Sequence, residues 1–329
     1  MIVSNKTLCV APMMDWTDRH CRMFHRQLTG RALLYTEMVT ADAILHGDQE
    51  RLLHFSSDEQ PVALQLGGSD PARLAEAAKA GAAAGYVEIN LNVGCPSPRV
   101  QSGRFGACLM AEPQLVAECV AAMAESVDVP VTVKNRLGID DQTPDEVLPT
   151  FLETVSGAGC KTFIIHARKA WLEGLSPKQN RDVPPLDYDL VYKMKRDFPQ
   201  LEIIINGGVE TLREVSKHRP HVDGVMMGRE AYHNPYVLAL VDQHFYGHRL
   251  DPLTRHEVVE RMKPYIEKEL SAGTRLHSIT RHMTGLFQGL PGARGWRRVL
   301  SEGGVGDGAG LEVLDEALRQ IRVDESAAA

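Results

Sequence analysis

One cysteine stands where a thiol could donate a proton. Cys95 lies in the stretch "EINLNVGCPSPRVQSGRFGACLM" (88–110), between a glycine and a proline and just after an apolar run ends. A free cysteine is usually buried packing material, and Cys108, on the following apolar stretch, is expected to pack. The Gly/Pro-rich loop around Cys95 is instead a place where functional side chains concentrate. A protonated thiol there can act as a general acid.

Further polar side chains follow other apolar runs along the chain. They are Glu37, Gln65, Asn90, Asn92, Lys134, Arg136, His166, Arg168, Asn206 and Arg229. If the runs are parallel strands of a barrel, their carboxyl ends meet at one face, where barrel enzymes place their active sites. We therefore expect these side chains to form one constellation with Cys95.

Two glycine motifs, "INGG" (205–208) and "MGR" (227–229), end the last two runs. Each alone is compatible with a tight turn, but together they predict a phosphate site of exposed backbone N–H groups with Arg229 adding charge. With the polar set above, this site suits flavin mononucleotide, because an ammonium such as Lys134 stabilises the negative charge of a reduced flavin. Alternatively, Lys134 is a Schiff-base lysine or pairs with Glu37, and His166 is a packed core histidine.

Eight short apolar runs of strand type alternate with helical segments. They cover residues 7–13, 33–39, 62–68, 86–91, 131–136, 162–168, 202–208 and 223–229. Apolar strands that alternate with helices indicate a parallel sheet covered by helices, and eight units favour a closed (β/α)8 TIM barrel of the α/β class. The competing architecture is a doubly wound open sheet, but no GxGxxG follows the first run.

The strand pattern stops after residue 247. Four segments with helical spacing follow, at 256–270, 276–290, 293–300 and 309–321. We predict two domains: a barrel over residues 1–247 and a small all-α helical bundle over residues 248–329.

The 329 residues carry a net charge of −7, so any nucleic-acid binding must use a local patch. Residues 274–298 contain five arginines and no acid, and residues 168–181 contain four basic residues and one glutamate. No apolar stretch has the length of a membrane span, and the first residues do not read as a leader. The six cysteines show no CxxC pair, so we expect reduced thiols, no metal site and a cytoplasmic location.

Nine stretches together resemble one known family. They are "APMMDWTDRHCR", "LLYTEMVTADAILHGD", "PVALQLGGSDP", "EINLNVGCPSPRVQSGRFGACLM", "PVTVKNRLGIDD", "FIIHARKAWLEGLSP", "INGGV", "DGVMMGREAYHNP" and "TRHMTGLFQGLPGARGWRRVLSE". From about Leu8 to Glu302 the chain is similar to the tRNA-dihydrouridine synthases, specifically the bacterial A-type. The resemblance implies an FMN-dependent enzyme that reduces the C5=C6 bond of uridines 20 and 20a in the tRNA D-loop, with NADPH as reductant.

The resemblance also implies residue roles. Cys95 matches the family's proton donor, and Asn92 matches a residue that touches the substrate nucleotide. The FMN-binding positions would be Pro12, Met13, Met14, Gln65, Lys134, His166, Asn206, Gly207, Gly208, Gly228 and Arg229. The positions that orient tRNA would be Lys178, Arg181, Arg294, Arg297 and Arg298, which makes residues 248–329 a tRNA-binding domain.

Two other functions stay open at this stage. A flavoenzyme of the dihydroorotate dehydrogenase type would share the barrel and FMN but act on free pyrimidines. A catalytically silent RNA-binding protein would keep the scaffold without FMN. We expect a monomer with no obligate protein partner.

Overall fold

The computed structural model describes residues 6–322 of the chain. Eight parallel strands close into a barrel in sequence order, each paired with the next and the last paired with the first. The strands are β1 (Leu8–Val10), β2 (Leu33–Thr40), β3 (Val62–Gly67), β4 (Glu88–Val93), β5 (Val131–Asn135), β6 (Thr162–His166), β7 (Glu202–Asn206) and β8 (Gly224–Met227). All eight predicted strands and the TIM barrel are confirmed, and closure excludes the open sheet.

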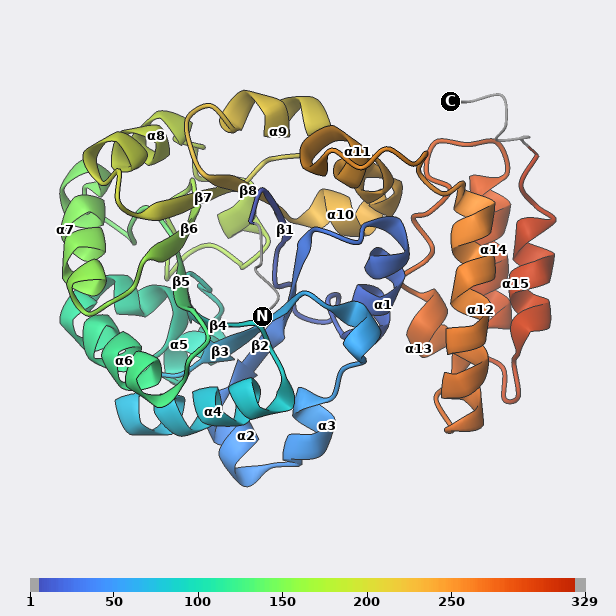
Figure 1. Cartoon of the computed structure of the whole chain (residues 1–329), viewed down its shortest axis with the longest axis horizontal. Helices are drawn as coiled ribbons and strands as arrows, with labels where there is room; N and C mark the ends of the chain where they lie inside the picture. The colour runs from blue at the N-terminus through green and yellow to red at the C-terminus, as the bar shows by residue number, and fades with distance from the viewer. Residues whose placement is uncertain (1–5, 323–329) are drawn as a thin grey trace. The chain divides into compact units, whose positions relative to one another are not determined.

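Helices cover the outside of this barrel (Figure 1). The longer ones are α4 (Pro71–Ala84), α6 (Pro113–Ser126), α7 (Pro144–Gly157) and α8 (Tyr188–Asp197), with the shorter α9 (Leu212–His218). The ends of α4 follow from its sequence: the Asp70 carboxylate accepts from the Arg73 N–H, Pro71 opens the helix, and Gly85 closes it with φ of 100°. Short helices in the loops are α2 (Ala41–His46), α3 (Gln49–Leu53), α5 (Pro98–Ser102), η2 (Gly106–Ala111) and η3 (Gln179–Arg181).

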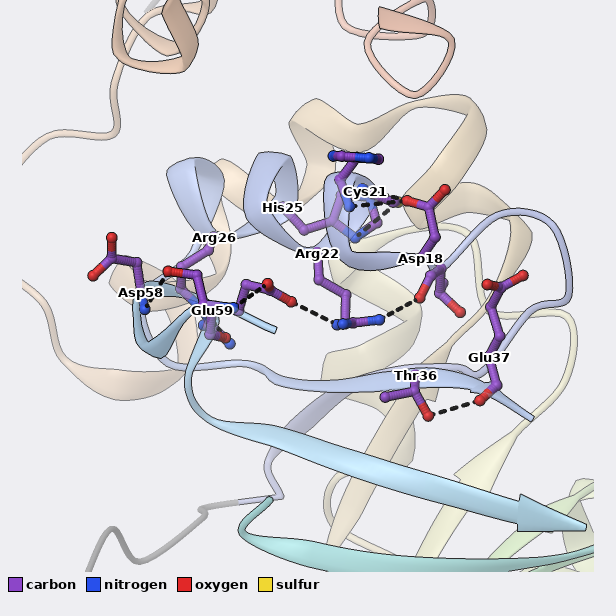
Figure 2. A network of polar contacts seen from close by, with 12 residues as sticks. Asp18, Cys21, Arg22, His25, Arg26, Thr36, Glu37, Asp58 and Glu59 are labelled. Atoms are coloured by element: carbon purple, nitrogen blue, oxygen red, sulfur yellow. Dashed lines mark hydrogen bonds and ion pairs between the residues drawn. The ribbon is translucent and has the colours of Figure 1, made fainter. Parts of the chain in front are cut away.

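A second compact unit is helical. It contains α1 (Arg19–Leu28), η1 (Ser57–Glu59), α10 (Arg229–His233), η4 (Pro235–Leu240), α11 (Val241–Tyr246), α12 (Arg255–Ser271), α13 (Leu276–Thr280), α14 (Ala293–Gly303) and α15 (Leu311–Leu318). Two buried ion pairs tie α1 into it. Arg19 binds the Glu269 carboxylate through both terminal nitrogens, and Arg22 donates from Nε to Glu59 at 2.8 Å, a contact that Figure 2 shows from close by. A bidentate pair such as Arg19 with Glu269 fixes orientation as well as adding energy.

The contacts group the chain differently from the predicted domains. One unit comprises residues 1–14, 33–55 and 61–228, and the other comprises residues 15–32, 56–60 and 229–329. Thus α1, which follows β1 in the chain, groups with the C-terminal helices. The predicted boundary between residues 247 and 248 stays a prediction about domains that fold on their own.

The helix predicted over residues 276–290 is wrong in length, because α13 ends at Thr280. The chain beyond it forms turns whose carbonyls also accept from side chains: the Trp296 indole donates to Met283 O at 3.1 Å, and Arg255 Nε donates to Leu286 O at 2.9 Å. Gly285 also approaches another backbone so closely that a Cβ would lie 2.4 Å from His233 O. These tertiary contacts end the helix at Thr280 although the apolar residues beyond it keep helical spacing. No helix of residues 6–322 has the length and apolarity needed to cross a bilayer.

Candidate active site

The loop that carries Cys95 follows β4 directly. The Asn92 side chain holds its first residues, because Oδ1 accepts hydrogen bonds from the backbone N–H groups of Gly94 at 3.1 Å and Cys95 at 3.0 Å. The carbonyl of Cys95 accepts from Ala107 N at 2.9 Å. Cys95 is half-buried, so its thiol is reachable while its backbone is fixed.

Cys108 differs from Cys95 in its surroundings. Its thiol donates to the Phe105 carbonyl at 3.1 Å, and burial raises its pKa. Those contacts agree with the expected packing role.

Buried amides line the barrel interior beneath this loop. Asn92 Nδ2 donates to Gln65 Oε1 at 2.8 Å, and Gln65 Nε2 donates to Asn90 Oδ1 at 2.8 Å. The register places these residues together, since Gln65 lies opposite Asn90 on adjacent strands. The sequence predictions placed Asn90 among the polar side chains at the strand ends but assigned no role to Glu88 or Thr132. The spacing along β4 could have indicated Glu88, because Glu88, Asn90 and Asn92 alternate along one strand and so face the same side.

Lys134 lies at the end of β5, and Nζ donates to Asn206 Oδ1 on β7 at 3.0 Å. Asn206 is itself fixed, since Nδ2 donates to the Met226 carbonyl at 2.8 Å. Burial, with a smaller contribution from the Arg136 charge, lowers the pKa of Lys134 to about 7. An ammonium that is poorly solvated in this way favours a negatively charged neighbour.

His166 and two glycines form the next part of the site. The ring Nδ1 of His166 is buried and has no hydrogen-bond partner within residues 6–322, and burial holds its pKa well below the usual value. Gly207 and Gly208 have φ of 111° and 70°, a region that disfavours side chains. A Cβ on Gly207 would lie 3.3 Å from the His166 ring, and a Cβ on Gly208 would lie 2.8 Å from the Tyr188 hydroxyl. Both positions therefore require glycine, because neighbouring side chains already fill the space that a Cβ would take.

The remaining predicted cofactor residues also follow strand ends. Pro12, Met13 and Met14 come after β1, where Met13 packs against the barrel core and Met14 is exposed. Gly228 follows β8, and Arg229 is the first residue of α10. The fold thus brings the predicted cofactor residues to the carboxyl ends of the strands, as expected.

Lys178 and Arg181 are exposed on a loop after β6. Asn180, fully buried between them, organises this loop: its Oδ1 accepts from Trp171 N at 2.7 Å, and its Nδ2 donates to Trp171 O at 2.8 Å. The Arg136 guanidinium donates to Asn180 O at 2.9 Å and to Gly94 O at 3.2 Å. One arginine therefore ties the basic loop to the Cys95 loop.

Gln101 makes a second such tie. Its Nε2 donates to Pro96 O and to Leu172 O, both at 2.8 Å. Trp171, beside Leu172, is 37% exposed and has the Lys169 ammonium 5.3 Å from its ring centre. An exposed aromatic ring with basic neighbours is a feature of nucleic-acid surfaces, and the sequence predictions did not assign one to Trp171.

Arg294, Arg297 and Arg298 lie on α14 of the helical unit. Arg294 and Arg298 are exposed, and Arg297 donates to Gln288 Oε1 at 3.3 Å. Residues three and four apart share one helix face. Another arginine of the acid-free window, Arg281, is bound to Asp18 at 2.7 Å, so it is less available for a ligand.

Taken together, the closed barrel and the polar, glycine-rich ends of its strands define a (β/α)8 barrel protein with a half-buried cysteine, Cys95, on the loop after β4. Residues 9–322 match the family described as dihydrouridine synthase (Dus), and the chain belongs to that family. The resemblance read from the sequence is confirmed.

Individual relatives agree with this assignment. The chain is 60% identical over 320 residues to the tRNA-dihydrouridine(20/20a) synthase of Shewanella oneidensis, covering 97% of this chain and 95% of the relative. It is 61% identical over 313 residues to the protein of the same name from Escherichia coli strain K12, covering 95% of this chain and 90% of the relative. Among solved structures, morphinone reductase aligns with a TM-score of 0.53 at 13% identity over 74% of this chain and 87% of that one, which is a likeness of fold.

Proposed function

We propose that this protein is an FMN-dependent tRNA-dihydrouridine synthase that reduces the C5=C6 bond of uridines 20 and 20a in the tRNA D-loop, with NADPH as reductant. The observation that carries the proposal is the Cys95 loop, whose backbone Asn92 holds directly after β4, at the strand ends that also carry Lys134, His166 and the glycine pair. The names of the relatives support the substrate.

The residues at the mouth fit a flavin. Lys134 is a poorly solvated cation that an anionic ring would stabilise, and His166 Nδ1 is a buried polar atom that needs a partner. Gly228 leaves its backbone open for phosphate, because a Cβ there would meet only Ala11 at 3.9 Å, and Arg229 adds charge. Gly207 and Gly208 would contribute backbone N–H groups. Gln65 keeps one N–H and one lone pair beyond its two hydrogen bonds, which can orient a polar ring edge. Pro12, Met13 and Met14 supply apolar contact for the ring system.

FMN held by Gln65, Lys134 and the glycine backbone would, once reduced, supply the hydride that C6 of the uracil ring needs. Cys95 donates its thiol proton to C5, as a general acid. Asn92 orients both partners, because it holds the Cys95 loop through Oδ1 and can contact the base through its amide nitrogen. Arg136 steadies the same loop through Gly94 O. The thiolate left on Cys95 must regain a proton before the next turnover.

The target uridine must leave its stack to reach such a mouth, as in other enzymes that act on bases. Lys178 and Arg181 on one unit, and Arg294, Arg297 and Arg298 on the other, would bind phosphates of tRNA. Contacts of that kind fix register rather than read sequence. We further infer that residues 248–329 act as a tRNA-binding domain and that the protein works in the cytoplasm, where its substrate is.

The test is a map of dihydrouridine in tRNA from a deletion strain, by mass spectrometry, before and after addition of the purified protein with NADPH. We expect tRNA from the deletion strain to lack dihydrouridine at positions 20 and 20a. Each of these uridines should gain about 2 Da, the mass of the two hydrogens added by the reduction, after the protein and NADPH are added. Activity on free uracil or dihydroorotate without RNA would instead favour the dihydroorotate dehydrogenase type of enzyme. A protein that takes up no flavin would favour a silent RNA-binding role.

A further inference from the structure

A continuous series of buried hydrogen bonds runs through the barrel from Glu88 to the Cys95 loop. Glu88 is the first residue of β4, and we call this end of the barrel its floor. There, Thr132 Oγ1 and the Tyr35 hydroxyl donate to Glu88 Oε1 at 2.7 and 2.6 Å. Asn90 Nδ2 donates to Thr132 Oγ1 at 2.8 Å. The series continues through the Gln65 and Asn92 amides described above and ends on the backbone N–H groups of Gly94 and Cys95.

Every side chain in this series is sheltered from water. Glu88, Asn90, Thr132 and Tyr35 are fully buried, Gln65 is 1% exposed and Asn92 is 9% exposed. Strand register builds the series, because Asn90 lies opposite both Gln65 on β3 and Thr132 on β5. Buried polar groups have few alternative partners, so each bond constrains the next.

The direction of the bonds is set at the floor. Glu88 Oε2 lies 3.3 Å from Lys6 Nζ, an ion pair rather than a directed hydrogen bond, and Lys6 also binds Glu202 at 3.0 Å. A carboxylate paired with an ammonium can only accept hydrogen bonds. Thr132 must therefore donate to Glu88 and accept from Asn90, and each amide above must then point its NH2 group toward the floor.

We propose that Glu88 is a positioning residue for the reaction: its carboxylate fixes the polarity of the Thr132, Asn90, Gln65 and Asn92 series and thereby holds the Cys95 loop. The link to catalysis rests on the proposed function. The polarity obliges Asn92 to turn Oδ1 toward the Gly94 and Cys95 N–H groups. A reversed Asn92 would place an NH2 group against those two donors and release the loop.

The same polarity determines what Asn92 can offer a substrate. Its oxygen already accepts two hydrogen bonds, and its nitrogen donates one to Gln65, so one N–H remains. That N–H can donate to a carbonyl oxygen of a uracil base but cannot accept from an amino group. Glu88, at the first residue of β4, thus specifies the hydrogen-bond character of Asn92, the residue that would contact the base in the proposed function.

The test compares Thr132→Val with Thr132→Ser in the flavin-loaded enzyme. Valine has the shape of threonine but cuts the series, whereas serine keeps the hydroxyl. Glu202→Gln is the matched control, because it alters a partner of the same Lys6 without touching the series. The first readout is amide hydrogen exchange of residues 91–97 by mass spectrometry, which needs neither substrate nor turnover.

In Thr132→Val we expect exchange at Gly94 and Cys95 to accelerate roughly tenfold, the size of one lost buried hydrogen bond, with the strand amides of β4 unchanged. Thr132→Ser and Glu202→Gln should exchange as the wild type does. Equal exchange in Thr132→Val and wild type, or equal acceleration along all of β4, would overturn the proposal, since the latter indicates a merely structural role.

The second readout separates the two halves of the reaction. In Thr132→Val, reduction of the flavin by NADPH should proceed at the wild-type rate, and dihydrouridine formation in a single turnover should slow roughly tenfold. An equal loss in both halves would contradict a role at the Cys95 loop. If wild-type protein makes no dihydrouridine, the proposed function fails, and the exchange measurement still decides the positioning role.

The polarity of the hydrogen-bond series also predicts a rescue. In Glu88→Gln, Lys6 still demands an acceptor, so the new amide should turn its oxygen to Lys6 and its NH2 group to Thr132, which reverses the series. Adding Lys6→Met removes that demand and lets the oxygen face Thr132 again. We expect the double variant to exchange more slowly at Gly94 and Cys95 than Glu88→Gln alone. Faster or equal exchange in the double variant would refute the polarity mechanism.

Discussion

The Lys134 ammonium should make the flavin-free protein more stable as the pH rises above neutrality. Its pKa falls from the ordinary 10.5 to about 7, first because of burial and then because of the Arg136 charge. Below pH 7 both folded and unfolded chains carry the charge, and the folded state bears the full desolvation penalty. Between pH 7 and 10.5 the unfolded chain binds more protons, so the free energy of unfolding increases with pH.

The size of this effect follows from the shift. A difference of 10.5 − 7 = 3.5 pKa units would correspond to about 5 kcal/mol at 1.36 kcal/mol per unit. The Lys134 side chain as a whole is only half-buried, and solvent screens part of the penalty, so we expect about 2 kcal/mol between pH 7 and 10. A bound anionic ring would offset the desolvation of Lys134, so the rise in the free energy of unfolding would move to higher pH.

The assay is urea unfolding of flavin-free protein at pH 7 and pH 10. In Lys134→Met the free energy of unfolding should no longer rise between pH 7 and pH 10. In Lys161→Met, which removes an exposed lysine just before β6, the rise should remain. The difference between wild type and variant isolates Lys134 from all other titrating groups. If Lys134→Met and wild type show the same dependence on pH, the lysine is not desolvated in the mouth and the reasoning is refuted.

Three further predictions concern the phosphate and tRNA surfaces. Gly208→Ala should weaken FMN binding at least tenfold by fluorescence titration, since a Cβ would lie 2.8 Å from the Tyr188 hydroxyl at φ of 70°; unchanged affinity would remove Gly208 from the cofactor site. Trp171→Ala should weaken tRNA binding by about 1 to 3 kcal/mol if a base stacks on it, and Trp171→Phe should restore most of that. Neutralising Arg294 and Arg297 together should reduce the salt dependence of tRNA binding while flavin content stays normal; an unaltered salt slope would exclude them from the interface.

Local patterns in the sequence predict the barrel well. Each strand is a short apolar run and each covering helix has its own end signals, as Asp70, Pro71 and Gly85 illustrate for α4. The strand-end positions of Cys95 and Lys134 follow from the same patterns. These features depend on neighbours along the chain, which a sequence displays directly.

Features that depend on distant contacts were not predicted. Asn90 was predicted to lie at the strand ends, but its link to Glu88 and Thr132 arises from the register of three strands, which no single apolar run displays. The grouping of α1 with the C-terminal helices requires pairs such as Arg19 and Glu269, 250 residues apart. The early end of α13 likewise follows from contacts with Trp296 and Arg255 that helical spacing does not encode.

The role of the Cys95 thiol is tested most directly by a single turnover of Cys95→Ala on tRNA that lacks dihydrouridine. We expect this variant to bind FMN and to be reduced by NADPH as the wild type is, and to form almost no dihydrouridine at positions 20 and 20a. Formation of dihydrouridine at the wild-type rate would show that another group delivers the proton to C5 and would contradict the account.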